Sequence, residues 1–255
     1  LACVSRLRCT AACPRFVTVL KRRPTRALAA TRRSVYLGLV ETTTPMTLAV
    51  RDEGRMAYGP ALELQHALVE ERLAERIPDT LMLLEHPPVI TMGRKAPDSD
   101  ILAPPEVLAA SGAEVHRITR GGEATYHGPG QLVGYTIFNL YQHDRKLRLF
   151  IERLEEVFIR VLSRYYGIDA ARDPEHRGVW AGDEKITAIG ISVSHRITMH
   201  GFAFNVAPDL SHFDWIVPCG IRDRGVTSLE KLTGTAPPMD VVKQQVVDAI
   251  CEVDG

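Results

Sequence analysis

Apolar residues recur at helical spacing in three segments of the chain. The clearest covers residues 147–165, where an apolar side chain returns every three or four positions and Gly167 follows shortly after the last one. Similar spacing runs from residue 56 to the residue before Pro78, and again over 241–253. A helix turns once in about 3.6 residues, so this spacing places the apolar side chains on one face. The pattern therefore predicts three amphipathic helices.

Shorter apolar runs predict strands on both sides of the long helix. They cover residues 48–51, 80–85, 89–91, 114–118 and 132–138 before it, and 179–180, 186–193 and 197–206 after it. Residues Ser194–Arg196 join the last two runs and are typical of a hairpin turn, while Pro97–Pro105 is expected to be a loop. Because the strands cluster without a regular strand–helix alternation, we expect an α+β fold with a mixed or antiparallel sheet and flanking helices.

Charge divides the chain near residue 45. Nine of the 31 basic residues lie in the first 40 positions, where no acidic residue occurs, so the rest carries 22 basic against 31 acidic residues. A body with a net charge of about −9 excludes a nucleic-acid-binding surface. We interpret residues 1–45 as a disordered basic extension and 46–255 as one globular domain. The chain opens on Leu1, so the extension could also be translated upstream sequence, and its Arg-rich composition also fits an organellar transit peptide.

Hydropathy and cysteine usage indicate the compartment. No apolar stretch approaches the roughly 18 residues of a membrane span, so we expect no membrane association. Only Cys219 and Cys251 lie in the body, which is no disulfide framework and is typical of a reducing compartment. We expect the cytoplasm, or the mitochondrial matrix if the extension is a transit peptide. The histidines lack metal-ligand spacing and no Cys-x-x-Cys pair occurs, so we expect neither a metal nor a cofactor.

The densest motif is Arg120–Gln131, which holds four glycines and a proline between two predicted strands. Glycine permits close backbone approach, so such a loop can hold a ligand against its amide groups. The motif fits neither the P-loop nor the dinucleotide-binding pattern, because no Gly-Lys-Ser/Thr follows and the glycine spacing differs. A ligand-binding loop and an elaborate hairpin connection both remain open.

Two residues carry candidate chemistry. Cys219 stands between Pro218 and Gly220, neighbours that suit neither a helix nor a strand interior, so a turn presents its thiol. A free thiol titrates near ~8.5 and needs a nearby cation or base to become a nucleophile, and several His or Lys residues qualify as that partner. Lys185 begins the apolar run 185–190, where a charged residue is most simply a solvated strand end. Cys251, by contrast, lies on the apolar stripe of the last helix.

Several of these stretches, taken together, resemble the bacterial octanoyltransferases, also called lipoate-protein ligase B. Among them are Leu83–Pro88, the glycine-rich motif, and the segments around Lys185 and Cys219. The matching segments follow the order of the family between about residue 47 and residue 255: 83–88, 91–94, 120–131, 178–180, 185–190, 200–206, 218–221 and 226–230.

The resemblance implies the fold shared by the catalytic domains of biotin and lipoate protein ligases. It implies that an octanoyl group passes from acyl carrier protein to a lysine of lipoyl domains, namely those of the 2-oxoacid dehydrogenase complexes and the glycine cleavage H protein. It makes Cys219 the acyl-thioester nucleophile and Lys185 the partner that lowers its pKa. The implied substrate-contacting residues are Arg120, Gly121, Gly122, Glu123, Ala124, Thr125, Tyr126, His127, Ala188, Ile189, Gly190, Gly201, Phe202 and Ala203.

Other functions remain as alternatives. They are an ATP-dependent ligase on the same fold, a Cys–His hydrolase that uses His127, and a non-catalytic acyl-binding module. We expect a monomer. Acyl carrier proteins and lipoyl domains are acidic, and the body is also net negative, so we expect a locally basic docking surface. Its candidate residues are Arg94, Lys95, Arg120, Arg222 and Arg224.

Overall fold

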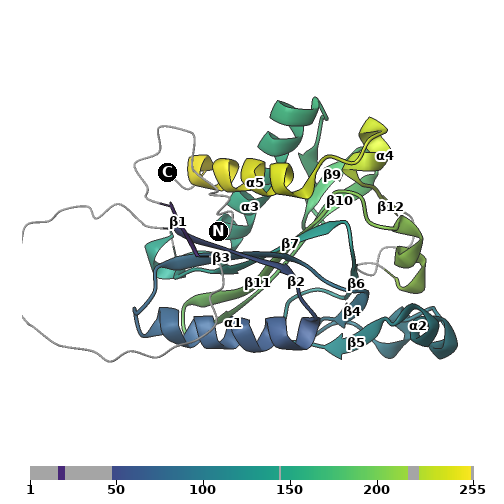
Figure 1. Ribbon diagram of the computed structural model, residues 1–255, viewed down its shortest axis with the longest axis horizontal. Coiled ribbons are helices and arrows are strands. Elements are labelled where there is room, and N and C mark those ends of the chain that lie inside the picture. The colour runs from purple at the N-terminus through teal and green to yellow at the C-terminus, as the bar shows by residue number, and fades with distance from the viewer. Residues whose placement is uncertain (1–16, 21–47, 144, 218–223, 254–255) are drawn as a thin grey trace, which may run out of the picture.

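A mixed β-sheet forms the centre of the structure (Figure 1). The computed structural model describes residues 17–20, 48–143, 145–217 and 224–253. Over these residues the strand order is β1-β2-β3-β7-β11-β10-β9-β8, with β12 beside β10. Strands β1, β2 and β3 run parallel and the pairs from β3 to β8 are antiparallel, which confirms the predicted mixed sheet. The bounds are β1 Val17–Leu20, β2 Leu48–Arg55, β3 Asp79–Glu85, β7 Gln131–Ile137, β8 Ala171–Arg172, β9 Val179–Ala181, β10 Glu184–Ser194, β11 Ile197–Asn205 and β12 Gly225–Val226.

Helices cover both faces of this sheet (Figure 1). They are α1 Tyr58–Leu73 on one face, and α3 Leu147–Tyr166 and α5 Met239–Val253 on the other. Strand β3 serves both layers: Leu81 and Leu83 pack with α3 and α5, whereas Met82 and Leu84 pack with α1. Successive strand side chains point to opposite faces, so a strand buried on both must be apolar throughout. Among the described residues, none of the helices combines the length and hydropathy needed to cross a bilayer.

A second, smaller sheet lies beside one end of the main sheet (Figure 1). Its elements and their neighbours are β4 Val89–Met92, β5 Glu114–Arg117, β6 Ala124–His127, α2 Pro105–Ser111 and the 3-10 helices η1 Asp98–Asp100 and η3 Leu210–Trp215. Residues 120–131 were expected to form one loop, but β6 forms inside it because Thr125 and Tyr126 suit a strand and pair with β4. Helices α2 and α4 (Leu229–Thr233) were not predicted, since they are too short to show a period.

The predicted turns around the long elements are confirmed. Between β10 and β11, His195 and Arg196 have φ of 46° and 73°, and positive φ at both central residues is what a type I′ hairpin turn requires. Helix α3 ends at Gly167, whose φ of 64° is left-handed and whose N–H donates to the Ser163 carbonyl at 3.2 Å.

Strand β1 lies within the basic N-terminal extension. Val17–Leu20 pairs in parallel with Leu48–Arg51, so this tetrapeptide belongs to the sheet, whereas the sequence predicted that the whole of residues 1–45 is disordered. The pairing gives β2 a second neighbour, and an unpaired β2 would leave its N–H and C=O groups at the sheet edge. The boundary between residues 45 and 46 stays a prediction.

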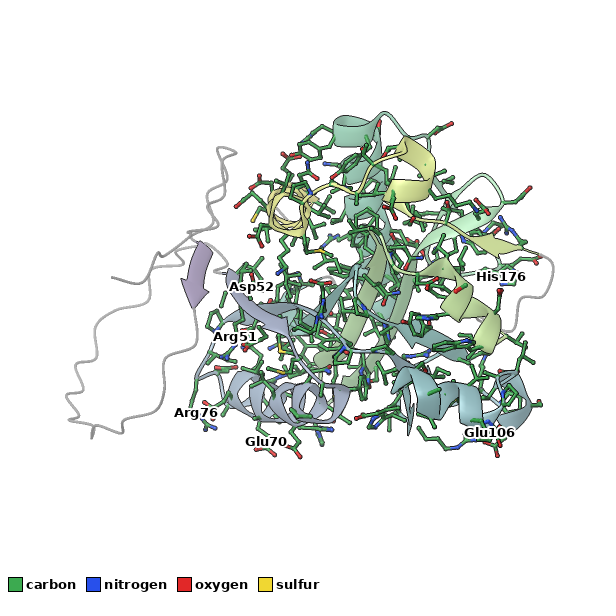
Figure 2. All side chains as sticks on the ribbon, turned by 45° about the vertical axis from the view of Figure 1, so that its right-hand side comes forward. Arg51, Asp52, Glu70, Arg76, Glu106 and His176 are labelled. Carbon is green, nitrogen blue, oxygen red and sulfur yellow. The ribbon has the colours of Figure 1, made fainter. Side chains whose placement is uncertain are left out.

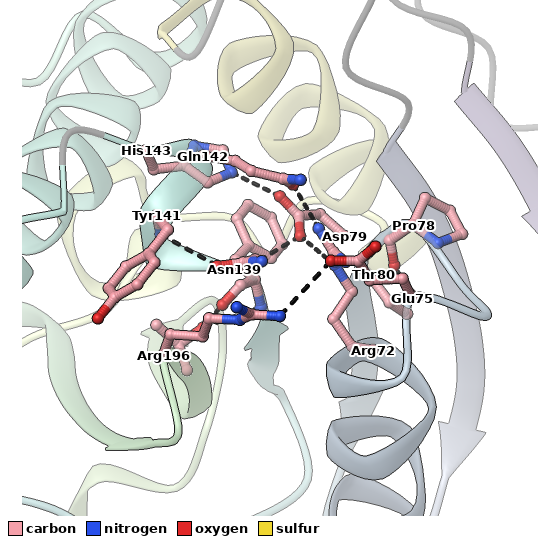
Figure 3. A network of polar contacts seen from close by, with 12 residues as sticks. Arg72, Glu75, Pro78, Asp79, Thr80, Asn139, Tyr141, Gln142, His143 and Arg196 are labelled. Carbon is pink, nitrogen blue, oxygen red and sulfur yellow. Dashed lines mark hydrogen bonds and ion pairs between the residues drawn. The ribbon is translucent and has the colours of Figure 1, made fainter.

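Asp79, the first residue of β3, is the centre of a buried polar network (Figure 3). Its carboxylate accepts from Arg72 Nε at 2.7 Å, from His143 Nε2 at 2.5 Å and from the Asn139 N–H at 2.9 Å. Arg72 also donates to Gln142. Burial alone raises the pKa of the Asp79 carboxyl, but the hydrogen bond and charge of His143 and the hydrogen bonds from Arg72 and the Asn139 N–H outweigh it and hold the pKa below its usual value. The network joins α1, β3 and the segment before α3.

Replacing Asp79 by alanine should therefore destabilise the fold strongly. The substitution leaves the buried Arg72 guanidinium without its carboxylate, and breaking a buried ion pair from one side typically costs about 3–5 kcal/mol. Urea unfolding measures the loss. The matched control is Glu71→Ala, which breaks the exposed pair with Arg76 at the outer surface (Figure 2) and should hardly move the midpoint. A wild-type midpoint for Asp79→Ala would show that the network does not stabilise the fold.

Candidate active site

A cavity of about 690 Å³ lies where the two sheets meet. The glycine-rich segment and β6 form one wall, and β7, β10 and β11 form another. The first turn of α1, the start of α3 and the loop before β9 complete the enclosure. Its lining residues are Tyr58, Arg94, Lys95, Ile118, Arg120–Glu123, Thr125, His127, Tyr135, Leu147, Ile151, Glu175–Arg177, Lys185, Ala188–Ile191 and His200–Ala203.

The structure brings together most of the residues that the sequence analysis assigned to substrate contact. Those that line the cavity are Arg120, Gly121, Gly122, Glu123, Thr125, His127, Ala188, Ile189, Gly190, Gly201, Phe202 and Ala203. Ala124 and Tyr126 do not line it and pack instead with Ile90 and Phe213 in the core of the smaller sheet. Because β6 is a strand, its alternate side chains point to opposite sides, and Thr125 and His127 take the cavity side. Cys219 lies outside the described residues.

Lys185 is buried in the cavity wall with 6% of its surface exposed. It lies on β10 between Trp180 of β9 and Val226 of β12, and its Nζ stands 4.8 Å from the centroid of the Trp180 ring. The β9–β10 register shifts between Lys185 and Thr187, an irregularity of the kind that re-aims a side chain. The sequence favoured a solvated strand end at this position, whereas the structure buries the amine.

The described residues on either side of the Cys219 segment are fixed by contacts. Before it, the Val217 N–H donates to the Asp100 carbonyl at 2.8 Å. After it, the Arg224 guanidinium lies 3.8 Å from the centroid of the Trp180 ring, which the Lys185 amine also faces. Arg224, which follows the Cys219 segment in sequence, therefore lies close to Lys185.

Arg120 ties the glycine-rich segment to β4. Its Nη2 donates to the Thr91 carbonyl at 2.8 Å and to the Thr91 hydroxyl at 3.1 Å. At Gly93 a Cβ would stand 2.2 Å from the Gly122 carbonyl oxygen, so only glycine permits this approach. The segment thus packs against β4 and presents the largely buried Arg120 side chain to the cavity.

A chain of hydrogen bonds fixes the tautomer of His127. The Gln131 amide nitrogen donates to the Tyr126 carbonyl at 3.2 Å and to Asn205 Oδ1 at 2.9 Å, and Asn205 Nδ2 donates to the Thr227 carbonyl at 2.9 Å. Backbone carbonyls can only accept, so both amides have one orientation. Gln131 Oε1 must then accept from His127 Nδ1 at 2.7 Å. His127 keeps its Nε2 lone pair as an acceptor.

The imidazoles around this wall are neutral at pH 7. Burial lowers the pKa of His127 to about 3 and that of His86 to about 4. His86 Nδ1 donates to the Met56 carbonyl at 2.7 Å, so its Nε2 accepts from the Tyr135 hydroxyl at 2.7 Å. At neutral pH these two imidazoles therefore act as hydrogen-bond acceptors at Nε2 and not as titrating groups.

Sequence reasoning missed several polar residues of the cavity, among them Tyr58 and His200. Both are 2% exposed, and within the described part of the chain the Tyr58 hydroxyl and His200 Nε2 have no hydrogen-bond partner. His200 has a φ of 62°, a strained value for a residue with a side chain. Burial raises the pKa of Tyr58 to about 12 and lowers that of His200 to about 4. The spacing of apolar residues does not predict that either side chain lines the cavity, although His200 directly precedes Gly201, which was predicted to contact the substrate.

Part of the wall is apolar. Leu147 and Ile151 of α3 face the cavity together with Ile189, Ile191 and Phe202 of the main sheet. Such a surface suits an alkyl chain, because each buried methylene gains roughly 0.8 kcal/mol. The arrangement can thus hold an acyl chain on one side and a polar reacting group on the other.

Comparison with known proteins gives the relatives of the chain. The lipoyl protein ligase A/B catalytic domain family matches residues 57–251. The octanoyltransferase of Caldicellulosiruptor saccharolyticus is 52% identical over 199 residues, which are 78% of this chain and 85% of that protein. The octanoyltransferase of Rubrobacter xylanophilus is 50% identical over 204 residues, or 79% of this chain and 91% of that protein.

Two solved structures share the fold at low sequence identity. LipL1 of P. falciparum in complex with lipoate has a TM-score of 0.66 and 13% identity, and the match covers 81% of this chain and 62% of that one. Lipoate-protein ligase A bound with ATP has a TM-score of 0.61 and 18% identity, with 81% and 84% covered. Both confirm the predicted ligase-type fold. Since the family matches most of the chain and its relatives are half identical to it, the chain belongs to the lipoyl protein ligase A/B catalytic domain family and, within that family, to the octanoyltransferases.

Proposed function

We propose that the chain transfers octanoyl from the thioester of an acyl carrier protein to a lipoyl-domain lysine through a thioester on Cys219. Octanoyl transfer to lipoyl domains follows from membership of the octanoyltransferases. The observation that supports the finer mechanism is the buried amine of Lys185, which lines a cavity with an apolar wall and a polar wall. We propose as acceptors the lipoyl domains of the 2-oxoacid dehydrogenase complexes and the glycine cleavage H protein. The relatives are bacterial proteins, which favours the cytoplasm over the mitochondrial matrix.

In the first step, the Cys219 thiolate attacks the carbonyl carbon of the donor. The new carbon–sulfur bond forms as the bond to the carrier sulfur breaks, and the carrier leaves as a thiol after it takes up a proton. A positively charged amine near the thiol favours its thiolate form. Lys185 is suited to this role because its amine is buried away from bulk water. It also pairs with Val226 of β12, the strand that follows the Cys219 segment in sequence.

In the second step, the acceptor lysine amine attacks the Cys219 thioester. A carbon–nitrogen bond forms, the carbon–sulfur bond breaks, and the proton of the amine returns to the departing thiolate. His127 Nε2 is an acceptor that can orient the incoming N–H. A pKa of about 3 makes His127 too weak a base to hold this proton at pH 7, which also argues against a Cys–His hydrolase.

Incubation with octanoyl carrier protein tests the acyl-enzyme. The wild-type chain should gain the mass of one octanoyl group, and Cys219→Ala should abolish both the added mass and the transfer. Cys251→Ala is the matched control, because that thiol is buried in α5 and should leave the adduct intact. Intact-protein mass spectrometry reads the result. Wild-type transfer by Cys219→Ala, particularly if it required ATP, would replace this mechanism with that of an adenylating ligase.

Activity should depend on pH through His127, because its Nε2 accepts a hydrogen bond only while the imidazole is neutral. In Gln131→Glu a carboxylate would accept from Nδ1 and stabilise the imidazolium, which raises the His127 pKa from about 3 toward neutral pH. Nε2 then becomes protonated and ceases to be an acceptor at low pH. The acid limb of the kcat/KM profile should therefore move to higher pH.

Two measurements are needed for this variant. Imidazole NMR follows the His127 titration, and Gln142→Glu serves as a control because Gln142 bonds Arg72 outside the cavity. If the His127 pKa rose and the activity profile stayed unchanged, His127 would have no part in orienting the amine.

Acyl length should matter only moderately on the short side. Loss of two methylenes removes roughly 1.6 kcal/mol of burial, which is a factor of about 15 in kcat/KM between octanoyl and hexanoyl donors. Competition between thioesters on the same carrier measures the ratio directly. A flat profile from six to twelve carbons would show that the apolar wall of Leu147, Ile151 and Phe202 does not enclose the chain.

A further inference from the structure

Cations gather around the cavity although the body of the chain is net negative. Five basic residues line it, Arg94, Lys95, Arg120, Arg177 and Lys185, against the acidic residues Glu123 and Glu175. Residues 41–255 as a whole hold 22 basic and 31 acidic residues. The cavity lining thus has an excess of basic residues, whereas the body of the chain has an excess of acidic ones, as expected of a site that attracts an anion.

Three of these cations, Arg94, Lys95 and Arg177, form what we call the basic rim. All three are exposed: Arg94 and Lys95 follow β4, and Arg177 follows the half-buried His176, which Figure 2 labels, in the loop before β9. The ion pairs found among the described residues do not include these three side chains, although Glu123 and Glu175 share the cavity lining. Arg177 does act at longer range on Glu155: burial raises the pKa of that carboxyl, and the Arg177 charge opposes the rise.

Neighbouring arginines differ from the basic rim in this respect. Arg224 pairs with Asp173 at 2.5 Å, and Arg172 pairs with Glu156 at 2.8 Å. Arg117 pairs with Asp98. These charges are already compensated within the chain, so Arg224 is not included in the basic rim. Arg222 lies outside the described residues.

We propose that the basic rim binds the phosphate group of the donor's prosthetic arm. This inference rests on the proposed function, in which the acyl group enters the cavity on a carrier. The rim residues are exposed and also line the cavity, so they lie where the arm would enter it. The phosphodiester is the anionic group of a phosphopantetheine arm, and Arg and Lys are the side chains that bind phosphate best.

The test compares two small donors that differ only in this phosphate. They are the octanoyl thioesters of 4′-phosphopantetheine and of pantetheine, each used with a lipoyl-domain acceptor. For the wild-type chain the phosphorylated donor should have a kcat/KM at least about tenfold higher, as expected for hydrogen bonds to a charged group. The advantage should shrink as salt rises, because the rim is solvent-accessible.

Variants of the basic rim should remove this preference. Arg94→Ala combined with Arg177→Ala should bring the ratio of the two donors close to one, and Arg177→Glu should reduce it further by repelling the phosphate. The matched control is Arg55→Ala with Arg145→Ala, which removes the same charge from positions that do not line the cavity and should keep the wild-type ratio. Thermal unfolding confirms that each variant is folded.

The possible outcomes separate the two proposals. If neither donor yields an octanoylated lipoyl domain, the proposed function fails. If the wild-type chain uses both donors equally well, the function stands and the phosphate site is wrong. If the donors are equal and the rim variants impair only the complete carrier protein, the rim binds the carrier's acidic surface, which also overturns the inference.

Discussion

The buried hydrogen-bond chain from Thr227 through Asn205 and Gln131 to His127 joins the two sheets and determines the geometry of the cavity. His127 ends β6 in the smaller sheet, while Gln131 begins β7 and Asn205 ends β11 in the main sheet. A buried polar group that loses its partner costs about 1–3 kcal/mol, so the two sheets have one favourable relative placement. Close backbone contact reinforces it: at Gly130, where φ is 83°, a Cβ would lie 2.2 Å from the Ala207 carbonyl oxygen.

Two buried lysines show how a similar degree of burial serves different ends. Lys243 of α5 donates to Asp52 of β2 at 2.9 Å and fastens a helix to the sheet. Lys185 is buried to nearly the same extent, yet it lines a cavity and faces an indole ring. Removal of a charge from water is costly, and a buried amine in a cavity wall is therefore a candidate for a functional role, which is the one proposed above for Lys185.

Much of the fold could be predicted from the sequence, because apolar residues recur at regular spacing along long helices and strands. The long helix of residues 147–166 and the hairpin through His195 are of this kind, since local spacing and turn chemistry determine them. Strand β6 was not predicted because it has only four residues and glycines lie on both sides of it. Without the strand, the sequence analysis could not predict that alternate side chains, Ala124 and Tyr126, point away from the cavity.

The rest of the candidate site depends on contacts between residues that are distant in sequence. Tyr58, Tyr135 and His200 come from three elements, and only packing of α1 against the main sheet brings them to one cavity. Arg177 was not predicted, because its sequence surroundings do not distinguish it from other charged loop residues, and only the structure places it in the cavity lining. The role of Gln131 is similar, because an amide in sequence does not reveal which neighbour it orients.

Three buried imidazoles, those of His127 and His200 in the cavity wall and that of His86 beside Tyr135, also make the stability of the fold depend on pH. His86, His127 and His200 have pKa values of about 4, 3 and 4, whereas an unfolded histidine titrates near ~6.5. Below that pH the unfolded chain binds protons that the folded chain does not, so the free energy of unfolding falls as the pH falls toward about 4. With all three unfolded imidazoles protonated, the slope approaches about 4 kcal/mol per pH unit. Burial of these three imidazoles, two of them in the cavity wall, therefore makes the fold less stable in acid.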